Sequence, residues 1–249
     1  MAVAGPALIA VAHGSRDPRS AATISAVVAG LARVRPDLAV RLAFLDLSTP
    51  SVEQVTDAVA AAGHTEAVVV PLLLGSAFHA RVDLPGLLAS ARARHPRLHV
   101  TQADVLGPDP RLVTALRDRV LATGADVADN RLGIAVAAVG SSSPTANRRT
   151  HHIGRRLATG TAWRTEVCFA TTTEPALPEA VSRLRARGCE RVIVAPWFLA
   201  PGLLTDRLAT AAPDLVHAAP IGSHPLLTEV IASRYAATVL AERIRHAAA

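Results

Sequence analysis

The sequence has no lysine, only two cysteines and few aromatic residues. Aromatic side chains make up 3% of its 249 residues, so Leu, Val, Ile and Ala must fill the core of a chain that is 50% hydrophobic. Charged residues interrupt every apolar run well short of the roughly 20 residues that span a membrane. The first residues have neither a basic segment nor a long apolar segment, so we expect a first strand there rather than a signal peptide, and no membrane partner.

The cysteines and the charges narrow the class of protein further. Cys168 and Cys189 lack CxxC spacing and suit a reducing cytoplasm, where we expect the protein to act. The formal net charge is +6, and all 26 basic residues counted in it are arginine, a composition that a GC-rich genome also produces. The planar guanidinium binds carboxylates and phosphates bidentately. Because the arginines are scattered and few aromatic side chains could stack on bases, we expect a small polyanionic ligand and no nucleic acid.

Apolar runs alternate with segments of helical spacing along the first half of the chain. Strands are predicted at residues 7–12, 38–45, 67–74 and 98–103, and helices at 18–34 and near 51–63, 84–95 and 109–122. This alternation predicts an α/β fold with a doubly wound parallel sheet.

The pattern then restarts, with an offset of about 125 residues. The segment "RLGIAVAAVGSSSPTAN" parallels "PALIAVAHGSRDPRSA", and "CERVIVAPWFLAPGLLTDRL" parallels "HTEAVVVPLLLGSAFHARVD". A solenoid would repeat with a much shorter period. We therefore expect two tandem flavodoxin-like doubly wound parallel sheets related by internal duplication, with domains at 1–126 and 127–249 and a linker near 123–130.

Histidines follow the first and third predicted strands. His13 comes directly after 7–12, and His79 lies in the loop after 67–74. In a flavodoxin-like strand order of 2-1-3-4, strands one and three are neighbours at the point where the winding reverses, and ligands bind there. Asp46 ends the second strand, so we expect it beside them.

The residues around His13 fit a ligand site. Gly14 would let a ligand approach the backbone closely. Asp17 is expected to cap a helix that has Pro18 at its first position, which would direct a partial positive charge toward the same edge.

Two imidazoles and a carboxylate have two uses. They bind Co, Ni, Fe or Zn ions and leave coordination positions open, unlike a closed structural zinc site. Imidazole also accepts protons near neutral pH. The plainer interpretation is that each histidine is a polar group satisfied by backbone and that Asp46 is a turn residue. We expect His151 and His152 to lie on a solvated face, and "SSSP" at 141–144 to cap the helix that follows.

Three segments, "VAHGSRDPRS", "FLDLSTPSVEQV" and "VVVPLLLGSAFHARVDLP", resemble the class II chelatases of the sirohydrochlorin chelatase family. The resemblance implies a chelatase-type fold and a lyase that inserts Co²⁺ or Fe²⁺ into the tetrapyrrole sirohydrochlorin, for cobalamin or sirohaem biosynthesis. It implies no nucleotide, because the family uses none and the sequence has no P-loop. It also implies no tightly bound cofactor, because the metal is a substrate.

Carried over to this sequence, the resemblance implies two active-site histidines, His13 and His79, and a metal-ligand set of His13, His79 and Asp46. The family's acid is Glu, and the shorter Asp46 leaves that role open. Substrate-binding residues are expected at Gly14, Ser15, Arg16, Gly75, Ser76, Arg81, Ser141 and Ser142. Which histidine is the base and which the ligand stays open, as does the choice between cobalt and iron.

The second half lacks this chemistry. Val139 stands where the first half has His13, Leu204 where it has His79, and Ala170 or Thr171 where it has Asp46. Valine and leucine neither bind metal nor carry protons. We therefore expect the second half to be a degenerate repeat that forms the opposite wall of the cleft. This arrangement matches the two-domain form of the family. Because such a chain can enclose a cleft alone, we expect a monomer.

Two other functions compete with metal insertion: that of a histidine phosphatase and that of a carrier. A histidine phosphatase requires an Arg-His pair, but Ala12 precedes His13. A non-catalytic metal or tetrapyrrole carrier would need the same ligands, so this alternative stays open.

Overall fold

The structure, a computed structural model, describes residues 5–75, 82–171 and 174–248. Within these ranges no helix combines the length and apolarity needed to cross a membrane. The chain forms two compact units. The first comprises the chain up to Gly107 and from Leu227 onward, and the second is Pro108–Leu226.

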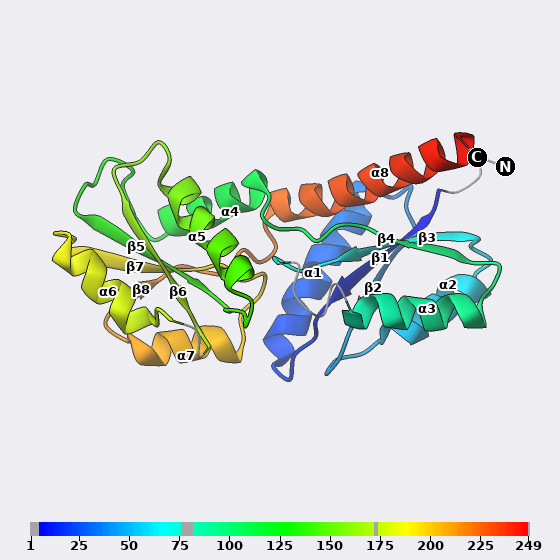
Figure 1. Cartoon of the computed structure of the whole chain (residues 1–249), viewed down its shortest axis with the longest axis horizontal. Coiled ribbons are helices and arrows are strands. Elements are labelled where there is room, and N and C mark those ends of the chain that lie inside the picture. The colour runs from blue at the N-terminus through cyan, green and yellow to red at the C-terminus, as the bar shows by residue number, and fades with distance from the viewer. Residues whose placement is uncertain (1–4, 76–81, 172–173, 249) are drawn as a thin grey trace. The chain divides into compact units, whose positions relative to one another are not determined.

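The first unit is built on a four-stranded parallel sheet in the order β2-β1-β3-β4 (Figure 1). Its strands are β1 (Ala7–Ala12), β2 (Val40–Phe44), β3 (Glu66–Pro71) and β4 (His99–Gln102). Every residue of β1 is buried, as expected for a central strand covered on both faces. The predicted strand order and parallel sheet are confirmed.

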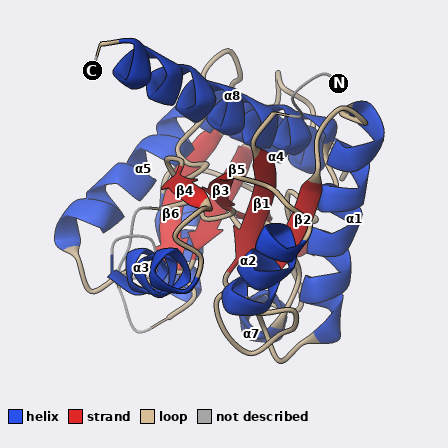
Figure 2. Cartoon of the chain, turned by 90° about the vertical axis from the view of Figure 1, so that its right-hand side faces the viewer, coloured by secondary structure: helices blue, strands red, loops and turns tan. Residues whose placement is uncertain are grey.

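Helices cover both faces of this sheet. They are α1 (Pro18–Val34), α2 (Val52–Ala61), α3 (Leu84–Arg94) and α8 (Pro225–Ala247). The buried residues of α2 and α3 pack with alternate residues of β1 and β3, such as Ile9 and Val69. Figure 2 shows α8 on the opposite side of the strands from α2 and α3. The first unit therefore has three layers, as a doubly wound sheet requires.

Local sequence signals explain where these elements begin and end. Ser51 and Gln54 form a complete capping box at the start of α2, as predicted. The third strand is shorter than the predicted 67–74. It ends at Pro71, which has no N–H to donate to a neighbouring strand.

The second unit repeats the plan with the order β6-β5-β7-β8. Its strands are β5 (Leu132–Ala138), β6 (Arg164–Phe169), β7 (Arg191–Pro196) and β8 (Val216–His217), and its helices are α4 (Pro110–Leu121), α5 (Pro144–Ala158), α6 (Leu177–Ala186) and α7 (Leu203–Ala211). Cys168 and Cys189 are free thiols in its core, and burial raises the pKa of Cys168 to about 12. The two matched sheets confirm the fold class expected from the duplication.

The last helix of each repeat belongs to the other unit. The Arg234 guanidinium of α8 donates to the carbonyls of Val105 and Leu106 (both 3.0 Å), and the Tyr235 hydroxyl donates to the Pro6 carbonyl (2.6 Å). Helix α4 packs on α5 and β7. The compact units therefore differ from the expected division at 126/127, which marks the end of the sequence repeat and falls inside the second unit.

Candidate active site

The expected site lies at the carboxyl edge of the first sheet. Strand β1 is hydrogen-bonded to β2 on one side and to β3 on the other, so the winding reverses between β1 and β3. His13 directly follows β1, and Leu72, directly after β3, donates its N–H to the Val11 carbonyl (2.7 Å). The loop that carries His79 therefore starts beside the end of β1, at the position where α/β sheets bind ligands.

His13 and Asp46 lie on adjacent backbones. The Asp46 N–H donates to the His13 carbonyl (3.0 Å), and both residues are exposed. The Asp46 carboxylate accepts from the next backbone N–H, that of Leu47 (2.7 Å). The expectation that Asp46 lies beside the end of the first strand is confirmed. Its carboxylate also makes a local hydrogen bond of the kind expected for a turn residue.

A neighbouring backbone requires glycine at position 14, and the expected role of Gly14 in substrate binding stays a prediction. Its φ of +96° is in the region that favours glycine, and a Cβ there would lie 1.7 Å from the Asp46 carbonyl oxygen. Only glycine lets the loops after β1 and β2 approach this closely.

A serine pair also joins these loops. The Ser15 N–H donates to Ser48 Oγ (3.1 Å), and the Ser48 hydroxyl donates to the Ser15 carbonyl (3.1 Å). Ser15 Oγ accepts from the Asp17 N–H (3.0 Å). Ser15, which is predicted to bind the substrate, therefore also orders its own loop. Sequence reasoning missed Ser48, since a contact between residues 33 apart leaves no spacing signal.

Leu47 is a second residue that sequence reasoning missed. It is 50% exposed, and its φ of +58° is uncommon for a non-glycine residue. The neighbouring contacts of Asp46 and Ser48 hold this strained backbone, which places an apolar side chain at the carboxyl edge of the sheet.

Asp17 caps α1 as predicted. Its carboxylate accepts from the Arg19 N–H (2.9 Å) and is also hydrogen-bonded to the Arg19 guanidinium, which lowers the pKa of Asp17. The N-terminus of α1 therefore directs its partial positive charge toward the same edge, where Arg16 is exposed.

Part of the expected site lies outside the described residues, namely His79, Ser76 and Arg81. Gly75, the last residue before them, has open space where a Cβ would be. Among the residues that the structure describes, no group of three or more His, Cys, Asp or Glu side chains is placed to hold a metal ion. The ligand set of His13, His79 and Asp46 stays a prediction.

The second sheet has the same backbone at its carboxyl edge. Ala12 pairs with Phe44 in the first sheet and Ala138 with Phe169 in the second, so Thr171, not Ala170, matches Asp46. The Thr171 hydroxyl donates to the carbonyl of Val139 (2.7 Å), which is 45% exposed at the position of His13.

The serines after β5 mainly order their own loop. The Ser141 N–H donates to Asn147 Oδ1 (2.9 Å), and Asn147 Nδ2 donates to the Ser141 carbonyl (2.7 Å). Ser143 caps α5 through the Ala146 N–H (3.4 Å), which confirms the capping role expected of this segment. Ser142 is exposed. A role for Ser141 and Ser142 in substrate binding stays a prediction.

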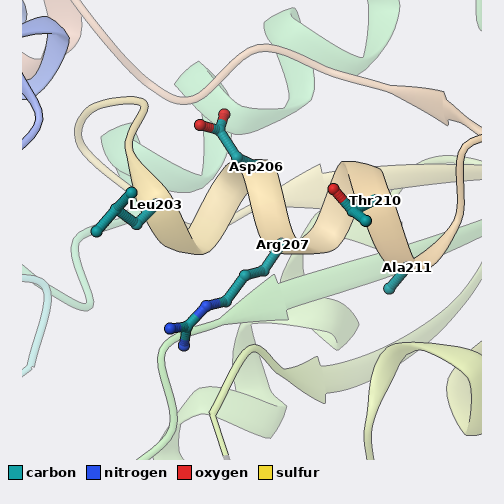
Figure 3. Close-up of a pocket in the computed structure, with 5 residues that line it drawn as sticks. All are labelled: Leu203, Asp206, Arg207, Thr210 and Ala211. Atoms are coloured by element: carbon teal, nitrogen blue, oxygen red, sulfur yellow. The ribbon is translucent and has the colours of Figure 1, made fainter.

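A cavity of about 390 Å³ lies against exposed residues of α7 in the second unit (Figure 3). Its described lining is Leu203, Asp206, Arg207, Thr210 and Ala211. Asp206 and Arg207 point to different sides of the helix in Figure 3. These side chains include no imidazole or thiol, so they do not offer the chemistry expected at His13.

The fold and this edge define a class of protein: a duplicated α/β protein with chelatase-type sheets, in which an imidazole lies beside a carboxylate-bearing loop at the first carboxyl edge. The chain belongs to the CbiX family, whose model matches residues 7–123 and 133–238. The matched ranges cover both repeats, and the resemblance noted in the sequence is confirmed.

Named relatives include enzymes for both metals. The chain is 29% identical over 236 residues to the sirohydrochlorin ferrochelatase of Priestia megaterium, covering 90% of this chain and 87% of the relative. It is 28% identical over 205 residues to the sirohydrochlorin cobaltochelatase of the same organism, covering 80% and 65%. The structure of SirB from Bacillus subtilis with Fe3+ superimposes with a TM-score of 0.81 at 25% identity, covering 94% of this chain and 95% of that one.

Proposed function

We propose that this protein is a sirohydrochlorin chelatase, a lyase that inserts Fe²⁺ or Co²⁺ into sirohydrochlorin. The observation that carries the proposal is the family match along both repeats, with relatives named as ferrochelatase and cobaltochelatase. The metal is a substrate. The product with Fe²⁺ is sirohaem, and the product with Co²⁺ is a precursor of cobalamin.

The chemistry is assigned to the first unit. Two pyrrole N–H protons leave the macrocycle as the metal enters, and an imidazole accepts a proton or holds the ion near neutral pH. His13, at the carboxyl edge of β1, supplies one imidazole, and His79 supplies the other. Asp46 adds a negative charge that favours a divalent cation or an imidazolium. Leu47 offers an apolar contact for a flat ring.

An optical assay of metal insertion tests the proposal. Sirohydrochlorin is mixed anaerobically with Fe²⁺ or Co²⁺, with and without substoichiometric protein. We expect multiple turnovers, and we expect His13→Ala and His79→Ala each to lower the catalysed rate at least about tenfold, the lower range of general-base effects. His151→Ala, an exposed histidine on α5, is the control and should keep the wild-type rate.

The same assay tests the alternative of a carrier. A carrier would bind metal or tetrapyrrole with one-to-one stoichiometry and stop after a single equivalent. Equal rates for wild type, His13→Ala and His79→Ala would reject the mechanism.

We also propose that the protein acts as a cytoplasmic monomer without nucleic-acid or membrane partners. The two free, buried thiols support a reducing compartment. Light scattering coupled to size exclusion measures the mass, for which 25.9 kDa is expected.

A further inference from the structure

Helix α5 has an exposed face that carries four arginines. Arg148, Arg149, Arg155 and Arg156 are all exposed on it. The sequence has no Asp or Glu from Asn130 to Thr165, so no acidic residue on this helix compensates the four charges. Like charges on one helix are mildly destabilising, so the face needs another explanation than helix stability.

The four arginines differ in their partners from Arg183 and Arg187 of the same unit. Arg183 on α6 pairs with Glu179 (2.5 Å), and Arg187 pairs with Glu166 (2.6 Å). In the described parts of the chain, no ion pair involves the four arginines of α5. Arg148 donates to a neutral group, Thr145 Oγ1 (2.8 Å). Their charge is therefore available to an anion from outside.

Arg155 and Arg156 are also not required to cap the helix. Arg117 of α4 performs that task, since its Nη2 donates to the carbonyls of Arg156 (3.1 Å), Leu157 (2.7 Å) and Thr159 (2.8 Å). The C-terminal carbonyls are satisfied, and the guanidinium groups of Arg155 and Arg156 remain exposed beside them.

The spacing of the arginines fits a ligand with several separated carboxylates. The pairs 148/149 and 155/156 are seven residues apart, which is two helical turns or about 10 Å along the same face. A single phosphate could reach one pair only. The rim of a flat polycarboxylate can reach both, and each guanidinium fork can bind a carboxylate bidentately.

We propose that the arginine face of α5, formed by Arg148, Arg149, Arg155 and Arg156, binds the rim carboxylates of the tetrapyrrole substrate. The proposal rests on the proposed function, because sirohydrochlorin is an octacarboxylate. The face raises the local concentration of substrate at the protein and contributes to its affinity, with the salt dependence of exposed charge pairs.

Binding of metal-free sirohydrochlorin, followed by fluorescence titration, tests the face directly. Two double variants, R148Q/R149Q and R155Q/R156Q, remove one arginine pair each and keep a good helix former. The matched control is R183Q/R185Q on α6, which removes the same charge from the opposite side of the same sheet. Circular dichroism and thermal unfolding confirm that all three variants are folded.

We expect each α5 variant to weaken binding about three- to tenfold at low salt and less than about twofold in 0.5 M NaCl, as for exposed ion pairs. The control should stay within about twofold of wild type throughout. A porphyrin with four carboxylates should show a smaller loss than sirohydrochlorin does.

Three results overturn the proposal. Equal losses in the α5 variants and in the control would show a general effect of net charge. No loss in either α5 variant would show that the face does not bind the substrate. Tight binding of duplex DNA that the α5 variants abolish would assign the face to nucleic acid. Failure of the wild-type protein to insert metal would instead reject the proposed function, so the two failures are distinguishable.

Discussion

At the carboxyl edge of the first sheet the chain has His13, Gly14 and Asp46, whereas the matched positions of the second sheet have Val139, Gly140 and Thr171. The backbones are alike. Leu45 donates to the Ala12 carbonyl at 2.9 Å, and its counterpart Ala170 donates to Ala138 at 2.8 Å. Both glycines have φ near +90°, at +96° and +91°.

The comparison separates the requirements of the fold from those of the chemistry. Main-chain hydrogen bonds and a left-handed glycine are present at both edges, so they belong to the way that this kind of unit turns from strand to helix. At these matched positions, the imidazole and the carboxylate are present at the first edge only. Exchanging residues between the edges therefore tests which of them carry the activity.

The largest effect on the rate of metal insertion is expected from replacing His13 with valine, the residue at the matched position of the second edge. His13→Val removes the imidazole from an exposed position, so we expect at least about a tenfold lower rate of metal insertion and a change in the free energy of unfolding within about 0.5 kcal/mol. Initial rates and urea unfolding measure the two quantities. A variant with the wild-type rate would show that the edges differ for another reason.

Gly14→Ala should destabilise the fold itself. The positive φ and the approach of the Asp46 carbonyl together should lower the free energy of unfolding by roughly 2–5 kcal/mol. The control is Gly63→Ala, which has a φ of +83° but nothing within 4 Å, and there we expect roughly 1–2 kcal/mol from φ alone.

Equal costs for Gly14→Ala and Gly63→Ala would mean that the loops separate readily. In that case the backbone contact with Asp46 would not be what holds the loop after β1.

The sequence predicted the features that depend on local patterns. Buried runs marked the strands, Asp17 before Pro18 marked the start of α1, and the restart of the pattern marked the second sheet. The position of His13 at the carboxyl edge followed from strand order. The pairing of His13 with His79 is a prediction that awaits experiment.

The features that sequence reasoning missed depend on contacts between distant segments. The Ser15–Ser48 pair and the backbone of Leu47 follow from how two loops meet. The exchange of α4 and α8 between the units was also missed, because the hydrophobic pattern of a helix does not say which of two similar sheets it packs on. Hydrophobic periodicity identifies the buried face of a helix and not its partner.

Asp46 should matter less than His13. Its carboxylate is exposed, and the charge it contributes is worth about 1 kcal/mol, or about fivefold in rate, as for exposed charge pairs. Asp46→Thr, the residue of the second edge, should therefore lower the insertion rate by about that factor, whereas Asp46→Glu should keep most of it. The ratio of the two rates at fixed metal concentration is the measurement. A loss for Asp46→Thr as large as that for His13→Val would make Asp46 an equal partner in the chemistry.

The smallest effects are expected at the two helix caps that follow these edges. Asp17 caps α1 with a 2.9 Å bond and a charge, whereas Ser143 caps α5 with a neutral 3.4 Å bond. Ser143→Ala should cost about 0.5 kcal/mol of unfolding free energy at every pH, and Asp17→Ala should cost more at pH 7. Because the folded protein lowers the pKa of Asp17 below its usual 3.8, the stabilisation is complete above that value and is lost as the pH falls through the lowered pKa. Urea unfolding at neutral pH and at about pH 2.5 should therefore show the Asp17→Ala difference shrinking in acid while the Ser143→Ala difference stays constant. If the Asp17→Ala difference kept its full size in acid, the hydrogen-bond geometry rather than the charge would distinguish the two caps.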